Sequence, residues 1–145
     1  MPPAPHPMPD TPALGAAGLA ALEERLAHDL LTLNWRARPW LPALSHGGQP
    51  VIDVLIIGAG QAGLAASMAL AQQGIAAVLL DRAATDYEGP WATTARMETL
   101  RSPKELTGPA LGLPSLTFRA WFEAQWGRSA WDALDKIPRL QWMDY

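Results

Sequence analysis

Three glycines at a fixed spacing are the residues of this sequence with the clearest chemical purpose. Gly58, Gly60 and Gly63 form the pattern GxGxxG, which is completed by Ala59, Gln61 and Ala62. In a strand–turn–helix, the first glycine allows a tight turn, the second lets a pyrophosphate approach the backbone, and the third lets the helix pack close to the strand. The helix would then direct N–H groups and the positive end of its dipole at the phosphates. The pattern predicts a dinucleotide-binding site at residues 58–63.

An acidic residue stands where the same kind of site needs one. Asp81 follows Gly58 by 23 residues, and an acid at about that distance accepts hydrogen bonds from an adenosine ribose. We interpret Asp81 as this ribose contact, with a turn or helix cap as the alternative. Arg82 could cover the adenine, reach a phosphate, or be an ordinary surface arginine. Because a carboxylate repels a 2′-phosphate, the site is expected to take FAD or NAD, with NADPH bound elsewhere.

Two strands and a helix must position these residues. Residues 51–57 and 75–80 are short apolar runs, typical of parallel strands that are buried on both faces. Between them, residues 64–73 have helical spacing, and Gly74 ends the helix. This order predicts the α/β class, with a Rossmann-like βαβ unit of a doubly wound parallel sheet. The contact between helix and strands is expected to be filled by Ala66, Leu70 and Val78.

The chain before this unit divides into three parts. Residues 1–10 are rich in proline and are expected to be a disordered tail. Residues 11–34 carry leucines at steps of three and four after Thr11 and Pro12, which predicts an amphipathic N-terminal helix. Residues 35–50 contain prolines and a Gly–Gly pair, which are typical of an extended linker.

A helical C-terminal segment is expected after the βαβ unit. Thr117 or Ser115 would cap a helix through Trp126, which would end before Gly127. Ser129 and Asp132 resemble a capping box for a second helix, and Pro138 would open a third. No stop signal for that third helix precedes Tyr145, so the chain is expected to be part of a longer protein.

Composition narrows the classes of function. The chain has 145 residues, of which 49% are hydrophobic, and a formal net charge of −3. That is enough for one buried core, and the negative charge argues against a nucleic-acid partner. The absence of cysteine excludes a disulfide framework, a CxxC redox pair and a cysteine zinc site. With no signal peptide, no membrane span and no metal spacing among its histidines, we expect a soluble cytoplasmic protein without a metal. The oligomeric state stays open.

Other aromatic and basic residues admit two interpretations. Core packing is expected for Trp121, Trp126 and Trp131. Trp91, in contrast, is expected to lie near the cofactor. A basic cluster could attract cofactor phosphates or an acidic substrate, or could be a solvated loop; its members are Arg96, Arg101 and Lys104.

Residues 51–91 resemble the N-terminal FAD-binding unit of single-component flavoprotein monooxygenases, a group that includes flavin-containing, Baeyer–Villiger and N-hydroxylating enzymes. Beyond the glycines and Asp81, the segment Tyr87-Glu-Gly89-Pro-Trp91 is similar to their GGxW segment, with Pro90 in place of the second glycine. Residues 95–98 are similar to the Ala-Arg-x-Asp segment of the Baeyer–Villiger enzymes. Residues 97–118 resemble the N-hydroxylases, which carry Asn where Gly63 stands.

This resemblance implies FAD as the cofactor, NADPH or NADH as the hydride donor, and oxygenation of a small-molecule substrate by reduced flavin and O₂. It makes residues 51–145 the incomplete N-terminal part of an FAD-binding domain. A second GxGxxG for NADPH is missing from the sequence, so the chain alone is expected to be inactive, and its catalytic residues are unknown. The implied cofactor-binding residues are Gly58, Ala59, Gly60, Gln61, Ala62, Gly63, Asp81, Arg82 and Trp91.

Three alternatives are weighed against this interpretation. Disulfide reductases share the FAD unit, but the missing CxxC disfavours them. An NAD-dependent dehydrogenase segment would use the same βαβ unit, and Asp81 slightly favours it. A non-catalytic nucleotide-binding or interaction module would use the helix at residues 11–34 as its partner surface.

Overall fold

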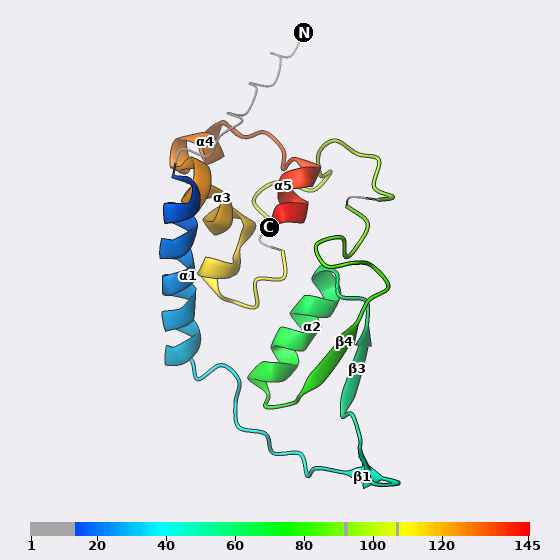
Figure 1. Ribbon diagram of the computed structural model, residues 1–145. Helices are drawn as coiled ribbons and strands as arrows, with labels where there is room; N and C mark the ends of the chain where they lie inside the picture. Colours follow the sequence, from blue (N-terminus) through cyan, green and yellow to red (C-terminus); the bar gives the residue numbers. More distant parts are fainter. Residues whose placement is uncertain (1–13, 92, 107) are drawn as a thin grey trace. The chain divides into compact units, whose positions relative to one another are not determined.

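The computed structural model describes residues 14–91, 93–106 and 108–145 (Figure 1). They form two compact units. The strand unit is Leu30–Thr93, and the aromatic unit combines the described residues through Asp29 with Thr94–Tyr145. This division differs from the boundaries predicted after residues 10, 34 and 50. The predicted tail at residues 1–10 lies outside the described residues.

The strand unit contains the predicted strand–helix–strand order. Its elements are β3 (Val54–Ile57), α2 (Gln61–Gln72) and β4 (Ala77–Leu80). The two strands are parallel and pair from Val54 opposite Ala77 to Ile57 opposite Leu80. Parallel neighbours need a crossover connection, and α2 supplies it. The α/β class is confirmed. Within the described residues this sheet has two strands, so the doubly wound sheet stays a prediction.

The sheet formed by β3 and β4 buries one face and exposes the other. Ile56 and Leu79 are half-buried, whereas 86% of Ile57 and 53% of Leu80 is exposed. Successive residues of a strand point to opposite faces, and one face is packed on α2. Within the described residues the strands are therefore covered on one face, and not on both as predicted.

The predicted helix–strand contact needs a related correction. Val78 is 42% exposed because it lies on the open face with Ile57 and Leu80. Ala66 is exposed on α2 as well, so neither residue fills the contact. Leu70 is half-buried.

The segment predicted as an extended linker packs against α2. The indole Nε1 of Trp35 donates to the carbonyl oxygen of Met68 at 3.2 Å, and that of Trp40 donates to the carbonyl oxygen of Gln73 at 2.8 Å. The chain then forms a small hairpin from β1 (Ser45–His46) and β2 (Gln49–Pro50). Its two turn glycines have positive φ, as a tight hairpin turn requires.

The aromatic unit has helices around two buried phenylalanines. Its elements are α1 (Gly15–Thr32, whose last residues belong to the strand unit), η1 (Pro114–Leu116), α3 (Phe118–Trp126), α4 (Arg128–Ala133) and α5 (Arg139–Asp144). Phe118 is 1% exposed and Phe122 is 0% exposed. The rings that contact them include those of Trp121, Trp126, Trp131, Trp142 and Tyr145. Core packing of the first three tryptophans is confirmed.

The ends of the C-terminal helices test the predicted caps. Thr117 caps α3 by accepting the N–H of Ala120 at 3.1 Å, and Gly127 follows the helix at φ 82°. Both were predicted. The capping box at Ser129 is wrong, because α4 already begins at Arg128. Pro138 precedes α5 as expected.

The amphipathic helix is confirmed as α1, and its apolar side is used within the chain. Leu22 is 7% exposed, and Asp29 accepts a hydrogen bond from the Ser115 hydroxyl at 3.0 Å. The interaction-module alternative for this helix stays a prediction. Among the described helices, none combines the length and apolar character needed to cross a bilayer.

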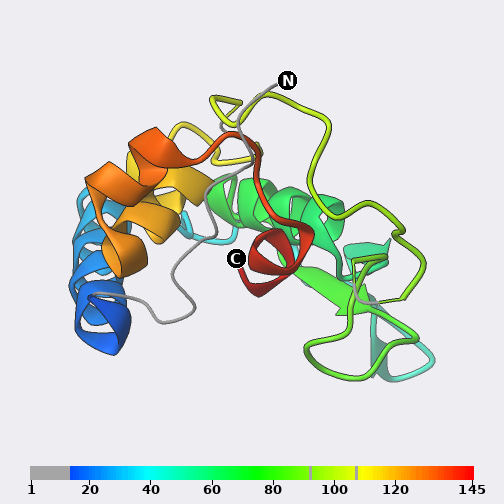
Figure 2. The same cartoon turned by 90° about the horizontal axis from the view of Figure 1, so that it is seen from above.

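Gly18 lets the backbones of α1 and α3 touch, and Figure 2 shows these helices side by side. A Cβ added at Gly18 would lie 1.7 Å from the carbonyl oxygen of Ala124. One turn earlier, the N–H of Leu14 donates to the carbonyl oxygen of Gln125 at 2.8 Å. Gly18 therefore lowers the helix propensity of α1, but the packing of α1 on α3 requires it.

We predict that Gly18→Ala lowers the stability of the chain, although alanine favours a helix by about 1 kcal/mol over glycine. The new methyl group would have to displace the main chain of α3. The urea midpoint of unfolding, followed by circular dichroism, measures the effect. Ala20→Gly, on the exposed side of the same helix, is the matched control and should cost about 1 kcal/mol through propensity alone. A higher midpoint for Gly18→Ala would contradict the packing role.

Candidate dinucleotide site

Gly58 makes the turn that leads from β3 toward α2. Its φ of +107° lies in a region that side chains with a Cβ rarely adopt. Its N–H donates to the carbonyl oxygen of Leu80 at 2.7 Å, which continues the pairing of β3 with β4. The turn is therefore attached to the end of β4.

Gly63 lets α2 lie directly on this turn. The residue is buried, and a Cβ added to it would lie 1.9 Å from the carbonyl oxygen of Gly58. The same Cβ would lie 3.3 Å from the side chain of Ile56. This is the close helix–strand packing that the third glycine of the pattern predicts.

Gly60 begins α2 and keeps its N-terminus accessible. It has an extended conformation, forms no side-chain cap, and is followed by a first turn without acidic residues. A Cβ added to it would meet only the backbone of Gly89, at 3.5 Å or more. The first turn of the helix thus carries no negative charge of its own at the positive end of the dipole, as a phosphate site needs.

Asp81 directs its carboxylate at backbone N–H groups on both sides. Its Oδ2 accepts the N–H of Ala59 at 2.8 Å, and its Oδ1 accepts the N–H of Ala83 at 2.8 Å. The N–H of Ala83 and then that of Ala59 hold the pKa of Asp81 below its ordinary value, with a smaller contribution from the charge of Arg82. A carboxylate has about four acceptor positions, so these bonds leave room for a ribose hydroxyl. That contact stays a prediction.

The structure brings the segment around Trp91 to the glycine turn. The backbone of Gly89 approaches Gly60, and the Trp91 ring carbon Cδ1 lies 3.8 Å from the Cβ position of Gly89. Gly89 was missed as a site residue by the sequence analysis. Its φ of +79° and its contact with Gly60 give it a role there, and its place in the GGxW-like segment was the available signal. Arg82 is exposed beside Asp81, and its contact with a cofactor stays a prediction.

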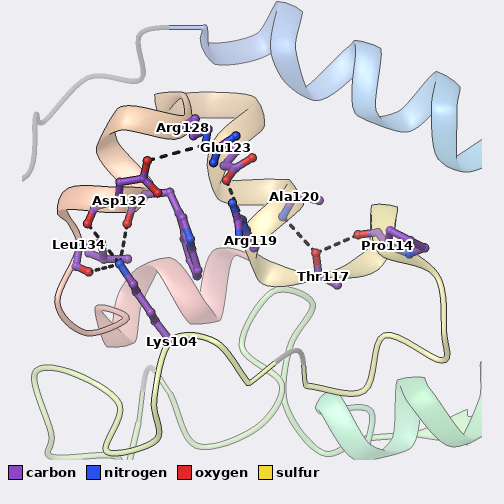
Figure 3. Close-up of polar contacts among 10 residues, drawn as sticks. Lys104, Pro114, Thr117, Arg119, Ala120, Glu123, Arg128, Asp132 and Leu134 are labelled. Carbon is purple, nitrogen blue, oxygen red and sulfur yellow. Dashed lines mark hydrogen bonds and ion pairs between the residues drawn. The ribbon is translucent and has the colours of Figure 1, made fainter.

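Lys104, one of the three residues of the basic cluster, binds backbone carbonyl groups within the aromatic unit. The ammonium group of Lys104 donates to the carbonyl oxygens of Trp131 at 2.8 Å and Leu134 at 2.5 Å (Figure 3). It therefore neutralises the C-terminal end of α4, where a cation is favoured. The interpretations of the cluster, as an attractor of cofactor phosphates or an acidic substrate or as a solvated loop, stay predictions. Arg96 and Arg101 are exposed and belong to the aromatic unit as well.

Comparisons with known proteins agree with this geometry. Residues 51–106 match the family described as FAD binding domain. The chain is 53% identical over 128 residues to the FAD-dependent urate hydroxylase of Xanthomonas campestris pv. campestris. The alignment covers 88% of this chain and 27% of that protein, so the chain spans about a quarter of the length of its curated relative. No solved structure matches the chain.

The family match contains the whole βαβ unit. It begins at Val51, ahead of β3, and includes the glycine turn, Asp81 and the Gly89–Trp91 segment. The alignment with the urate hydroxylase is longer than the family match and extends the likeness to most of the chain. Residues 51–106 therefore resemble an FAD-binding domain, and most of the chain is similar to one part of a urate hydroxylase.

Proposed function

We propose that this chain binds FAD at the glycine turn and belongs to a monooxygenase that hydroxylates urate or a closely related heteroaromatic compound. The observation that carries the proposal is the βαβ geometry around Gly60, found within residues that match an FAD-binding family. The substrate class follows from the name of the relative, which is 53% identical over the aligned region.

The residues present fit the adenosine and pyrophosphate half of FAD. Gly60 would let the pyrophosphate reach the N-terminal turn of α2, and Asp81 would accept the ribose hydroxyls. Arg82 would lie beside the adenosine, and Trp91 would border the turn. FAD, when bound, supplies the redox chemistry, and the protein supplies binding, orientation and exclusion of water.

Two further features belong to the same proposal. The β3–β4 pair would be part of a doubly wound parallel sheet, since its open face carries Leu55, Ile57, Val78 and Leu80. NADPH or NADH would be the hydride donor, bound outside residues 58–63 because the sequence contains one GxGxxG pattern.

Gly60→Ala should separate cofactor binding from folding. The methyl group would meet Gly89 at 3.5 Å, an ordinary contact, and Gly60 has φ −70°, which alanine adopts without strain. The fold should survive, but the methyl would stand where the pyrophosphate must approach, and FAD affinity should fall roughly tenfold or more. Equilibrium dialysis with FAD and the urea midpoint measure the two effects.

Gly63→Ala is the contrasting variant, since its methyl would collide with the carbonyl of Gly58. It should lose stability and binding together. Undiminished FAD binding by a folded Gly60→Ala chain would contradict the assignment of the pyrophosphate site.

A chimera tests the activity. In it, this chain replaces the matching segment of the Xanthomonas campestris urate hydroxylase. We expect a yellow protein that consumes urate in the presence of NADH or NADPH and O₂, and the chimera carrying Gly60→Ala should be colourless and inactive. A folded chimera without flavin would contradict FAD binding. A flavin-loaded chimera that rejects urate but oxidises another heteroaromatic compound would correct the substrate alone.

Asp81 should discriminate against a 2′-phosphate on the ribose. ADP-ribose should compete with FAD for the chain, and its 2′-phosphorylated form should compete roughly tenfold more weakly because two like charges meet. Because Asp81 is exposed, added salt should reduce the difference. Equal competition by both ligands at low salt would show that Asp81 does not contact the ribose.

A further inference from the structure

The carboxylate of Asp81 joins two backbone segments that are far apart in the sequence. Ala59 lies between Gly58 and Gly60 in the glycine turn, and Ala83 lies just beyond β4. Each donates its N–H to a different oxygen of Asp81 at 2.8 Å. Both bonds lie within the chain, so a ribose contact explains neither of them.

The hydrogen bond between Asp81 and Ala59 is the second one that joins the glycine turn to the end of β4. The N–H of Gly58 binds the carbonyl oxygen of Leu80 at 2.7 Å, and the next N–H, that of Ala59, binds the side chain of the next residue, Asp81. Two consecutive donors of the turn are thus held by two consecutive residues at the end of β4. Ala59 is flanked by glycines, whose backbone is the most permissive of any residue, so this second attachment restricts a turn that would otherwise have many conformations.

The pair of bonds also selects the residue type. The bond from Ala83 spans two residues, as in the Asx turn that the short side chains of Asp and Asn form. Asn could keep one of the two bonds, because its amide has one acceptor oxygen and its NH₂ group only donates. Glu would keep the charge, but its longer stem does not form the Asx turn. A single aspartate satisfies both N–H groups.

We propose that Asp81 is a positioning residue that holds the glycine turn in its binding geometry before any cofactor arrives. A ribose would then bind to a carboxylate that the backbone has already oriented. This second step rests on the proposed function, whereas the positioning step is a property of the chain without FAD.

Amide hydrogen exchange in the full chain without FAD tests the positioning step. Asp81→Ala should accelerate exchange at Ala59 and at Ala83 several-fold to roughly tenfold, the range expected for the loss of one hydrogen bond. Asp81→Asn should retain protection at Ala83 and lose it at Ala59, because the Asx turn needs only one acceptor. Asp81→Glu should accelerate exchange at Ala83. Asp53→Asn removes an exposed carboxylate before β3 and should change neither amide.

A pH titration followed by NMR gives a readout that general loosening would not produce. The amide protons of Ala59 and Ala83 should shift together as Asp81 becomes protonated. Because these N–H groups favour the ionised form, both bonds should persist above the lowered pKa and weaken as the pH falls through it. Arg82 is the charged neighbour that acts on Asp81, and Arg82→Gln should move the titration to higher pH without uncoupling the two amides.

The outcomes separate this inference from FAD binding. If the Ala59 amide of the unsubstituted chain exchanges as fast as in Asp81→Ala, or if the two amides do not titrate together, the positioning role is overturned, whether or not FAD binds. A protected Ala59 in a chain that fails to bind FAD would overturn the proposed function and leave the positioning role supported.

Discussion

Helix α2 can lie on the β3–β4 pair only because Gly63 brings no side chain to the carbonyl oxygen of Gly58. Any Cβ there would lie 1.9 Å from that oxygen. This contact sets the distance between the helix and the sheet, and it directs the N-terminus of α2 to the turn where Gly60 is accessible. The proposed pyrophosphate site, its neighbour Gly89 and the attachment through Asp81 all depend on this placement.

Glycine permits a close backbone contact in two other places as well. Gly18 brings α1 against the backbone of Ala124, and Gly74 brings the end of α2 against the carbonyl oxygen of Arg38. Gly18 is unfavourable within a helix, whereas Gly74 has the positive φ that favours glycine just after one; both permit a backbone contact that a Cβ would block. The indole N–H of Trp40, bonded to Gln73, reinforces the contact near Gly74.

Charged side chains that suggest a ligand site also serve the backbone in this protein. Lys104 satisfies carbonyl groups at the end of α4, and Asp81 satisfies N–H groups at the ends of two segments. The two side chains differ in whether they can still bind a ligand. Lys104 is half-buried beneath the carbonyls that it binds, whereas Asp81 is exposed and has acceptor positions for a ligand. Asp81 can therefore combine a structural role with a binding role.

Several features could be predicted from the sequence: the βαβ unit, the glycine turn, the caps of α3 at Thr117 and Gly127, and the aromatic packing of Trp121, Trp126 and Trp131. These features follow from local periodicity, turn chemistry and side-chain size, which are legible over short stretches. Other features became visible only in the folded chain: which face of the strands is covered, the packing of residues 35–50 on α2, the contact at Gly18, and the binding of Lys104 to α4. Folding also brought Gly89 to Gly60 and Asp81 to Ala59. These outcomes depend on atoms from distant positions meeting at a few ångströms, and no local pattern of residue types specifies such a meeting.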